Sequence, residues 1–242
     1  MFGRFLEIGL STDQIAASVQ FYERLGFSQL VTTDAWLHHY GVLSDARAYL
    51  GLHARAMPSP AVTFVLPDVA RSLSRLGAAG IEPESTDFGE EGLHHARLRD
   101  PGGHTVVLVE ARTFSPAPKG VLRPSLCGYF SHLSLPQRDF DTARAFWELA
   151  GFVALAEEDE PFPHQPLTSD HLDLAFHQRR TFDAPLLVFE SENIGVTIAR
   201  LRAIGVSPSD ELPRGLDPER HALIEAPEGT ALLLVPAPPD DV

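Results

Sequence analysis

Cysteine is almost absent from this chain of 242 residues, which contains Cys127 alone. A single thiol closes no internal disulfide, and it does not by itself build a zinc site, which takes about four ligands. Disulfide scaffolds and cysteine-based zinc modules are therefore excluded. A lone cysteine fits a reducing compartment, and we expect a cytoplasmic protein.

Basic side chains are also scarce. The chain has 19 Lys and Arg against 33 Asp and Glu, and its formal net charge is -14. Such a charge repels phosphate backbones and anionic lipid, so we expect neither nucleic acid nor a membrane as a partner. Long apolar runs are missing as well, because no segment approaches the ~18 residues of a membrane-spanning helix and the N-terminus lacks the apolar stretch of a signal peptide.

Several short catalytic signatures do not occur in the sequence. It has no GxSxG nucleophile elbow, no Walker phosphate loop, no CxxC pair and no HExxH zinc helix. Serine hydrolases, P-loop nucleotide enzymes and zincin proteases therefore have no motif support.

Glycine and proline, by contrast, are abundant, with 18 and 20 copies, and four glycines are regularly spaced. Gly26, Gly80, Gly151 and Gly205 each follow an amphipathic helix pattern and precede an apolar strand start, which is typical of glycine just past a helix end. The members of each successive pair are 54 residues apart, and the two pairs are offset by 125 residues. This spacing predicts four repeats arranged as two pairs.

Each repeat is a unit of about 50 residues with a common order of elements. In the first unit, FLEIGL (5–10) is typical of a strand and IAASVQFYERL (15–25) of an amphipathic helix, and three short β-prone stretches follow. The other units begin in the same way. The sequence therefore predicts an α+β protein built from four βαβββ units.

The units are too small to fold singly, because about 50 residues bury too little apolar surface for a core. A stretch rich in Pro, Gly and Ser separates the second unit from the third. We therefore expect an N-terminal domain at 1–113, an ordered linker at 114–127 and a C-terminal domain at 128–238, with two units in each domain.

The paired βαβββ pattern, FYERLGF (21–27) at the first helix end and DPGGHTVVLVE (100–110) together resemble the vicinal-oxygen-chelate superfamily. This superfamily includes glyoxalase I, extradiol dioxygenases, fosfomycin-resistance enzymes and bleomycin-resistance proteins. The resemblance covers nearly the whole chain as two tandem glyoxalase-like domains. It implies that each pair of units curls into a cup-shaped mixed sheet, with ligand and metal inside the cup.

The resemblance also implies four metal-ligand positions in each cup. The first-strand position falls on Glu7 in the first domain and on His132 in the second, and both side chains can bind a metal. The other positions carry no donor side chain, falling near Gly51, Ala61 and Val107 in the first domain and near Ala175, Leu186 and Leu233 in the second. With one of four ligands left in each cup, the sequence argues against glyoxalase and extradiol dioxygenase activity.

Eleven histidines remain, and some occupy matched positions in the two domains. His53 matches His177 at one strand end, and His95 matches His221 before the last strand. Together with the first-strand residues they form two candidate sets, which are Glu7, His53 and His95 in the first domain and His132, His177 and His221 in the second. By contrast, we expect His38, His39 and His94 to lie on half-exposed strands facing solvent.

Two interpretations of the candidate sets stay open. In the first they are displaced metal sites, because two His and a carboxylate suit non-heme iron and three His suit zinc. The cofactor would then be one divalent metal, Zn, Fe, Mn or Ni. In the second they are structural histidines carried through a duplication, and there is no cofactor.

Two functions follow from these interpretations. The first is a binding or resistance-type protein that holds a small, partly aromatic molecule in a cup; its acidic run EEDEP (157–161) is either a solvated turn or a cover for a cationic ligand. The alternative is a divalent-metal-dependent lyase, isomerase or dioxygenase with Glu7 as general base. A third arrangement keeps one domain functional and the other as its structural partner. Since two cups in one chain imitate a dimer of single-domain relatives, we expect a monomer or a homodimer.

Overall fold

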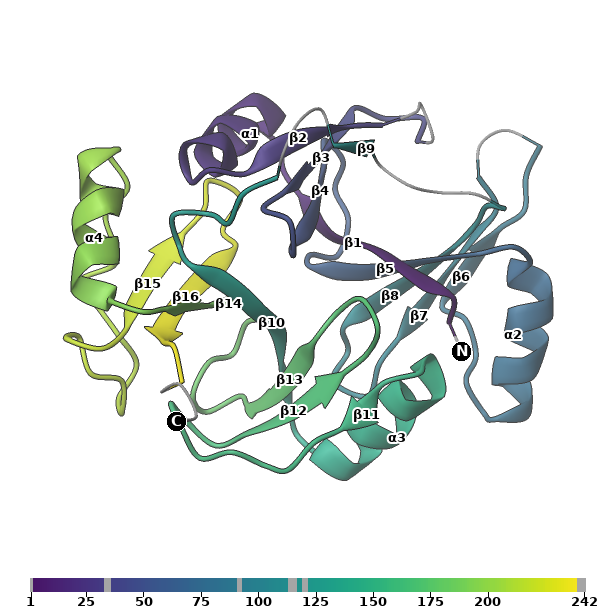
Figure 1. Cartoon of the computed structure of the whole chain (residues 1–242). Helices are drawn as coiled ribbons and strands as arrows, with labels where there is room; N and C mark the ends of the chain where they lie inside the picture. Colours follow the sequence, from purple (N-terminus) through teal and green to yellow (C-terminus); the bar gives the residue numbers. More distant parts are fainter. Residues whose placement is uncertain (1, 33–35, 91–92, 113–116, 119–121, 239–242) are drawn as a thin grey trace.

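The structure is a computed structural model that describes residues 2–32, 36–90, 93–112, 117–118 and 122–238. Its strands form two mixed β-sheets of similar plan, one in each half of the chain (Figure 1). Helices pack on the outer face of each sheet, where their apolar side chains join a common core. The two tandem domains and the α+β class predicted from the glycine spacing are confirmed.

The first sheet has the strand order β6-β7-β8-β5-β1-β4-β3-β2-β9. Its strands are β1 (Arg4–Ser11), β2 (Ser28–Val31), β3 (Tyr40–Ser44), β4 (Tyr49–His53), β5 (Ala61–Leu66), β6 (Ser85–Asp87), β7 (His95–Arg99), β8 (Thr105–Glu110) and β9 (Ala117–Pro118). Its helices are α1 (Ile15–Arg24) and α2 (Val69–Ala78). β1 pairs in parallel with β4 and antiparallel with β5, so the two units of the domain meet at their first strands.

The second sheet repeats this plan with the order β11-β12-β13-β10-β14-β16-β15. Its strands are β10 (Tyr129–Gln137), β11 (Val153–Ala154), β12 (His164–Thr168), β13 (Leu174–Gln178), β14 (Leu186–Ser191), β15 (Ala222–Glu225) and β16 (Ala231–Pro236), and its helices are α3 (Phe140–Ala150) and α4 (Ile194–Ala203). The units again meet at their first strands, because β10 pairs antiparallel with β14.

The fourth unit differs from the expected βαβββ order by one strand. Residues 206–221, between α4 and β15, form no strand. Pro208, Pro213 and Pro218 remove three backbone donors from this stretch, which weakens any strand there. A single bond from the Ser209 amide to the Leu223 carbonyl, 2.7 Å long, joins this stretch to β15.

The four spaced glycines have the backbone conformation that the sequence predicts. Gly26, Gly80, Gly151 and Gly205 have φ values of 98°, 79°, 108° and 76°, in the left-handed region that favours glycine. Each ends its helix and turns the chain into the following segment. The repeat read from the sequence is therefore a repeat of helix ends.

The two domains pack with an approximate twofold relation. Phe27 contacts Phe189 with ring centroids 6.4 Å apart, and Phe64 contacts Phe152 at 6.5 Å. Phe152 is the 125-residue equivalent of Phe27, and Phe189 is that of Phe64. The first unit therefore packs on the fourth and the second unit on the third. One apolar cluster contains side chains from both domains.

Two polar contacts repeat this relation. The Tyr22 hydroxyl of α1 donates to Glu228 Oε1 at 2.7 Å, and Trp147 Nε1 of α3 donates to Asp100 Oδ2 at 3.2 Å. Each contact joins the end of one helix to the last hairpin of the other domain. Burial raises the Tyr22 pKa well above its usual value, and Glu228 raises it further.

The expected linker, 114–127, lies partly outside the described residues, at 114–116 and 119–121. Its described part is not only a spacer, because β9 pairs with β2 and extends the first sheet. The domain limits at 113 and 128 stay predictions.

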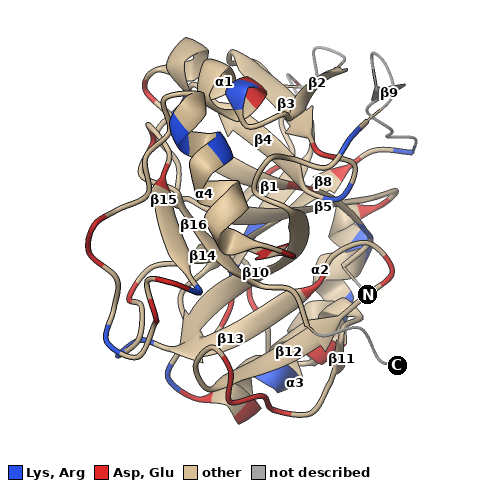
Figure 2. Cartoon of the chain, turned by 60° about the vertical axis from the view of Figure 1, so that its left-hand side comes forward, with Lys and Arg blue, Asp and Glu red and all other residues tan. Residues whose placement is uncertain are grey.

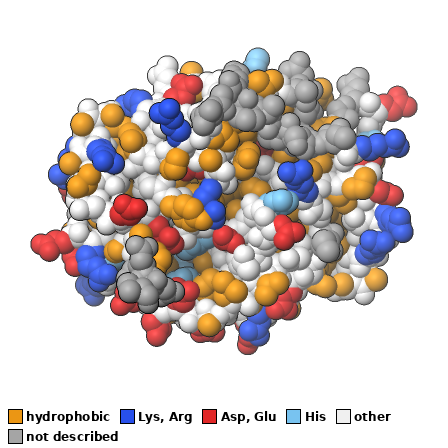
Figure 3. Space-filling view, viewed as in Figure 1, with side chains coloured by type: hydrophobic (Ala, Val, Ile, Leu, Met, Phe, Trp, Pro, Cys, Tyr) orange, Lys and Arg blue, Asp and Glu red, His pale blue; other side chains and the backbone are white. Residues whose placement is uncertain are grey.

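Charged side chains are spread over both domains. Figure 2 shows acidic and basic positions distributed along the chain, and Figure 3 shows them interspersed on one face without a large area of one sign. None of the helices in the described ranges is long and apolar enough to cross a membrane. The net negative charge is therefore not concentrated in a single patch on this face.

Candidate functional site

Strand alternation determines which side chains point into each cup. In β1, Ile8 and Leu10 join the helix-side core, so Glu7 and Gly9 face the cup. In β10, Leu133 and Leu135 join the core in the same way. His132 and Ser134 therefore face the second cup.

The first cup is filled by its own side chains. Ala61, Val107 and Val109 on its floor pack against Trp36 and Met57 from flanking loops and against Leu93. The cavity left beside them measures about 30 Å³. Among the described residues of the first cup, this cavity is far smaller than the ~300 Å³ or more of a typical small-molecule site.

A hydrogen-bonded chain of three side chains crosses this filled cup. Glu7 and His53 are only 1% and 2% exposed, and His53 Nε2 lies 2.9 Å from Glu7 Oε1. His53 Nδ1 lies 2.9 Å from His38 Nε2. Both ring nitrogens of His53 are therefore engaged, which leaves neither free for a metal.

His38 differs from the expectation of a solvent-facing strand residue. It lies in the loop before β3, and its ring bonds to His53. Burial lowers the His38 pKa, and His53 and Arg55 lower it further while Glu7 opposes them. His38 lies two residues before Tyr40, which is paired with His53 in the β3–β4 register. The sequence missed the contact because it did not give this strand pairing.

Gly51 explains how Glu7 is accommodated. A Cβ at this position would collide with the Glu7 carboxyl group. The glycine therefore leaves the space into which the carboxylate reaches toward His53. The position that the superfamily resemblance assigns to a metal ligand is used here as room for a neighbouring side chain.

His95 lies in the same cup as His53. Both line the small cavity, and the His95 ring is 5.9 Å from Trp36. Its Nδ1 donates to the Leu93 carbonyl at 3.0 Å. The structure thus places all three residues of the first candidate set in one cup, with a direct contact between Glu7 and His53.

The second cup contains a cavity of about 590 Å³, which we call the C-terminal cavity. It is within the size range of small-molecule sites. Its apolar wall is formed by Phe162, Leu174, Val188, Leu233 and Val235. Most of these side chains belong to a separate cup-side cluster, so the wall is a packed surface and not part of the helix-side core.

Three histidines line the C-terminal cavity, namely His132, His164 and His221. The rings of His132 and His164 are nearly parallel, with centroids 5.9 Å apart and an interplanar angle of 11°. Burial lowers the His132 pKa to about 3, and His164 and His177 contribute to the lowering. At neutral pH, His132 therefore presents a neutral imidazole to the cavity.

His177 lies behind the cavity wall and does not line it. It is 0% exposed, its Nδ1 is 2.7 Å from Ser134 Oγ, and its Nε2 donates to the Phe182 carbonyl at 3.1 Å. Burial lowers its pKa to about 4. Of the second candidate set, the structure brings His132 and His221 to the cavity and leaves His177 as a buried, fully bonded side chain.

The polar rim of the C-terminal cavity is mainly acidic. Glu158, Glu160, Glu190 and Asp173 line it, with Arg220 as the one cation among the described lining residues. Two glutamates of the acidic run at 157–161 thus reach the cavity. This excess of carboxylates favours a positively charged group in the ligand.

The donor side chains do not fit a divalent metal centre. Within the described ranges, no group of three His, Cys, Asp or Glu side chains is placed to hold a metal ion. His53 and His177 have both ring nitrogens engaged. The metal assignments made from the sequence stay predictions, and we derive no chemical step through a metal.

His164 is the lining residue that the sequence did not single out. It stands opposite His177 in the β12–β13 register, and its Nδ1 donates to the Phe162 carbonyl at 2.9 Å. The search for matched histidines did not select it. Placing β12 beside β13 would have revealed it, since the pairing brings both histidines together.

Comparison with known proteins identifies the fold family. Residues 4–108 match the sequence model of the Glyoxalase/Bleomycin resistance protein/Dioxygenase superfamily. The match spans most of the N-terminal domain, and the C-terminal domain has the same sheet plan. The resemblance drawn from the sequence is confirmed. No curated protein matches the sequence.

Several solved structures share the fold over both domains. A catechol 2,3-dioxygenase is 17% identical, with a TM-score of 0.57 over 97% of this chain and 89% of that chain. The Mn(II)-bound glyoxalase from Novosphingobium aromaticivorans is 14% identical, with a TM-score of 0.61 over 96% and 81%. Homoprotocatechuate 2,3-dioxygenase from Arthrobacter globiformis is 14% identical, with a TM-score of 0.61 over 99% and 83%. Likeness at these identities establishes the fold and not the reaction.

Proposed function

We propose that the chain binds one small, partly aromatic molecule in the C-terminal cavity and that the N-terminal domain is its structural partner. The observation that carries this proposal is the difference between the two cups. The second retains about 590 Å³, whereas the first retains about 30 Å³. This is a binding or resistance-type role within the superfamily.

The cavity walls define the class of ligand. Phe162 and the rings of His132 and His164 offer flat surfaces for an aromatic group. Because His132 is neutral at physiological pH, it supplies no charge to attract an anion. Glu158 and Glu190 supply negative charge. The ligand class that fits is an aromatic amine or another aromatic cation.

Glu7 has a structural role in this proposal. Its carboxylate is buried in the filled first cup and bonded to His53. A general base must lie within reach of the proton that it removes, and the cavity between the described residues beside His53 measures only about 30 Å³. We therefore assign no proton transfer to Glu7.

Paired probes of the same ring and opposite charge test the proposal. Isothermal titration should show that 1-naphthylmethylamine binds once per chain and at least tenfold more tightly than 1-naphthoate. Val188→Phe should abolish amine binding because the larger ring occupies the cavity. The matched control is Val196→Phe, on the exposed surface of α4. Equal binding of both probes, or binding that survives Val188→Phe, would contradict the proposal.

Elemental analysis separates this role from the metal-dependent alternative. Protein purified without added metal should contain far less than one divalent ion per chain, because apolar contact and carboxylate charge are sufficient for binding. About one tightly held Zn, Fe, Mn or Ni per chain would instead support a lyase, isomerase or dioxygenase. His132→Ala should then release that metal.

A further inference from the structure

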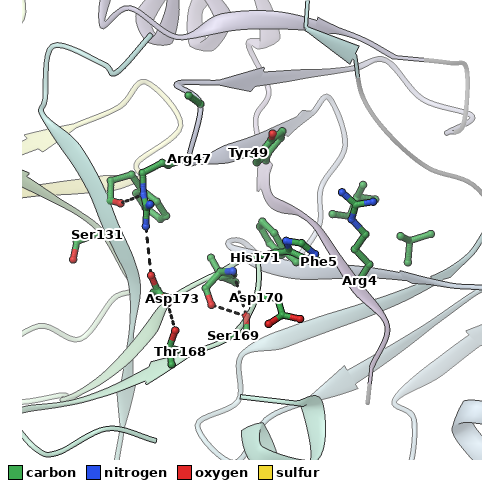
Figure 4. Close-up of a pocket in the computed structure, with 15 residues that line it drawn as sticks. Arg4, Phe5, Arg47, Tyr49, Ser131, Thr168, Ser169, Asp170, His171 and Asp173 are labelled. Atoms are coloured by element: carbon green, nitrogen blue, oxygen red, sulfur yellow. Dashed lines mark hydrogen bonds and ion pairs between the residues drawn. The ribbon is translucent and has the colours of Figure 1, made fainter. Parts of the chain in front are cut away.

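A second cavity of about 510 Å³ lies between the two domains (Figure 4). Its walls come from β1 and the β3–β4 turn of the first domain and from β10 and the β12–β13 turn of the second. It adjoins the C-terminal cavity, with which it shares Ser131, Thr168 and Asp173. Both turns line the cavity, and residues 125 positions apart are equivalent in the two domains. Each side chain on one side of the cavity can therefore be compared with its equivalent on the other side.

The two turns carry the same Ser-Asp pair but use it differently. In the first turn, Asp45 is buried and its Oδ1 accepts the Ala48 amide at 2.8 Å. In the second turn, Ser169 Oγ accepts the Leu172 amide at 3.2 Å, so a serine hydroxyl instead of the aspartate closes the turn. Asp170, the equivalent of Asp45, is exposed at the cavity and has no hydrogen bond or ion pair within the described part of the chain.

The two arginines that line the cavity, Arg47 and Arg4, also differ in their interactions. Arg47 lies 3.5 Å from Asp173 and 3.9 Å from the centre of the Tyr129 ring, and its Nε donates to the Phe130 carbonyl. Arg4, the equivalent of Tyr129, lines the cavity with no ion pair or hydrogen bond to any described residue. Figure 4 shows the bonded Arg47 and Asp173 on one side, and Arg4 and Asp170 on the other.

The side with Arg4 and Asp170 therefore offers one cation and one anion that the protein leaves unpaired. Phe5, Tyr49 and His171 line the same cavity and provide ring surfaces near them. A purely anionic ligand would meet Asp170 and a purely cationic ligand would meet Arg4. A ligand with both charges satisfies both groups.

We propose that this interdomain cavity binds a zwitterionic α-amino acid with an aromatic or large apolar side chain. The ligand carboxylate pairs with Arg4 and its ammonium group with Asp170. Its side chain packs against Phe5 and Tyr49. This site is independent of the role proposed for the C-terminal cavity.

Titration with L-phenylalanine tests the proposal on the full chain. We expect saturable binding of one molecule per chain, weakened about tenfold or more by Arg4→Gln and by Asp170→Asn. Arg214→Gln and Asp210→Asn, on an exposed loop of the second domain, are the matched controls and should leave binding unchanged. Phenylalaninamide, which lacks the carboxylate, and N-acetylphenylalanine, which lacks the ammonium group, should each bind at least tenfold more weakly.

The neighbouring cavity requires one further control. Val188→Phe fills the C-terminal cavity and should not change phenylalanine binding. Loss of phenylalanine binding in that variant would overturn the proposal, since the amino acid would then lie in the C-terminal cavity. The absence of saturable binding, or binding of either single-charge analogue as tightly as L-phenylalanine, would also overturn it.

Discussion

The absence of a side chain at Gly51 leaves the space that the Glu7 carboxylate occupies in the first cup. Because a Cβ there would meet the Glu7 carboxyl group, only glycine lets that carboxylate lie against His53. A buried carboxylate is costly unless it is hydrogen bonded, and His53 supplies the bond. The glycine, the acid and the imidazole therefore form one structural unit.

Gly51→Ala should lower the free energy of unfolding by roughly 1–3 kcal/mol, because the added methyl group forces the Glu7 carboxylate away from His53. Urea denaturation measures this effect. Gly41→Ala is the matched control on the neighbouring strand β3, where an added Cβ meets nothing within 4 Å. Equal stability of the two variants would show that Glu7 moves aside without cost.

His177 makes stability depend on pH. Its pKa is about 4 in the folded protein and close to 6.5 when exposed, so the unfolded chain binds more protons between these values. Above about pH 6.5, His177 is neutral in both the folded and the unfolded chain and does not lower the free energy of unfolding. As the pH falls from 6.5 toward 4, the unfolded chain alone takes up the proton, so the free energy of unfolding decreases. At pH 5 this loss amounts to about 2 kcal/mol.

His177→Gln should therefore reduce the stability difference between pH 7 and pH 5 by about 2 kcal/mol, as measured by urea denaturation at each pH. The free energy of unfolding at pH 5 is subtracted from that at pH 7 for the same protein. A change in stability that the substitution causes equally at both pH values therefore cancels. Exposed His39→Gln should retain the wild-type difference. An unchanged difference in His177→Gln would mean that this imidazole is protonated in the folded state at pH 5.

At the scale of elements, the β7–β8 hairpin joins the first domain to the second. Its buried Asp100 accepts the His104 amide at 2.7 Å, Gln137 Nε2 at 2.6 Å and Trp147 Nε1 at 3.2 Å. One carboxylate thus closes its own turn and holds both β10 and α3. In the repeated hairpin of the other domain, Glu228 accepts a hydrogen bond from the Tyr22 hydroxyl of α1.

Asp100→Ala should lower the free energy of unfolding by about 2–4 kcal/mol, because it leaves the Gln137 and Trp147 donors buried without an acceptor. Urea denaturation followed by Trp147 fluorescence measures both the loss and the changed ring environment. Asp210→Ala, on an exposed loop, should change stability by less than about 0.5 kcal/mol. A similarly small effect of Asp100→Ala would show that water replaces the carboxylate at the hairpin.

At the scale of the whole molecule, the domains share one apolar core. The same cluster contains Phe2 and Phe64 from the first domain and Phe146 and Phe189 from the second. Phe2 contacts Phe146 directly, with ring centroids 5.4 Å apart. Separating the domains would expose these rings to water, so neither domain is expected to unfold alone.

The chain should therefore unfold in one cooperative transition. Trp36 reports on the first cup and Trp147 on α3, so Trp147→Phe and Trp36→Phe give single-tryptophan proteins that follow each domain separately. Each protein should show the same urea midpoint by fluorescence as by circular dichroism. Two midpoints in either protein would show that the domains unfold independently.

The sequence by itself determined the repeated architecture. Glycine at a left-handed helix end and apolar alternation along a strand are local requirements, so Gly26 and Gly151 marked equivalent positions before any contact was known. These features depend on residues close together in the chain.

Only the tertiary structure decided which cup is open. Trp36 and Met57 fill the first cup from loops that strand periodicity does not govern, whereas the second cup keeps its volume. Likewise, His53 and His177 occupy matched positions but have different hydrogen-bond partners. His53 bonds to Glu7 and His38, whereas His177 bonds to the Ser134 hydroxyl and the Phe182 carbonyl. Cavity volume and hydrogen-bond partners arise from contacts between segments far apart in sequence, which local patterns do not encode.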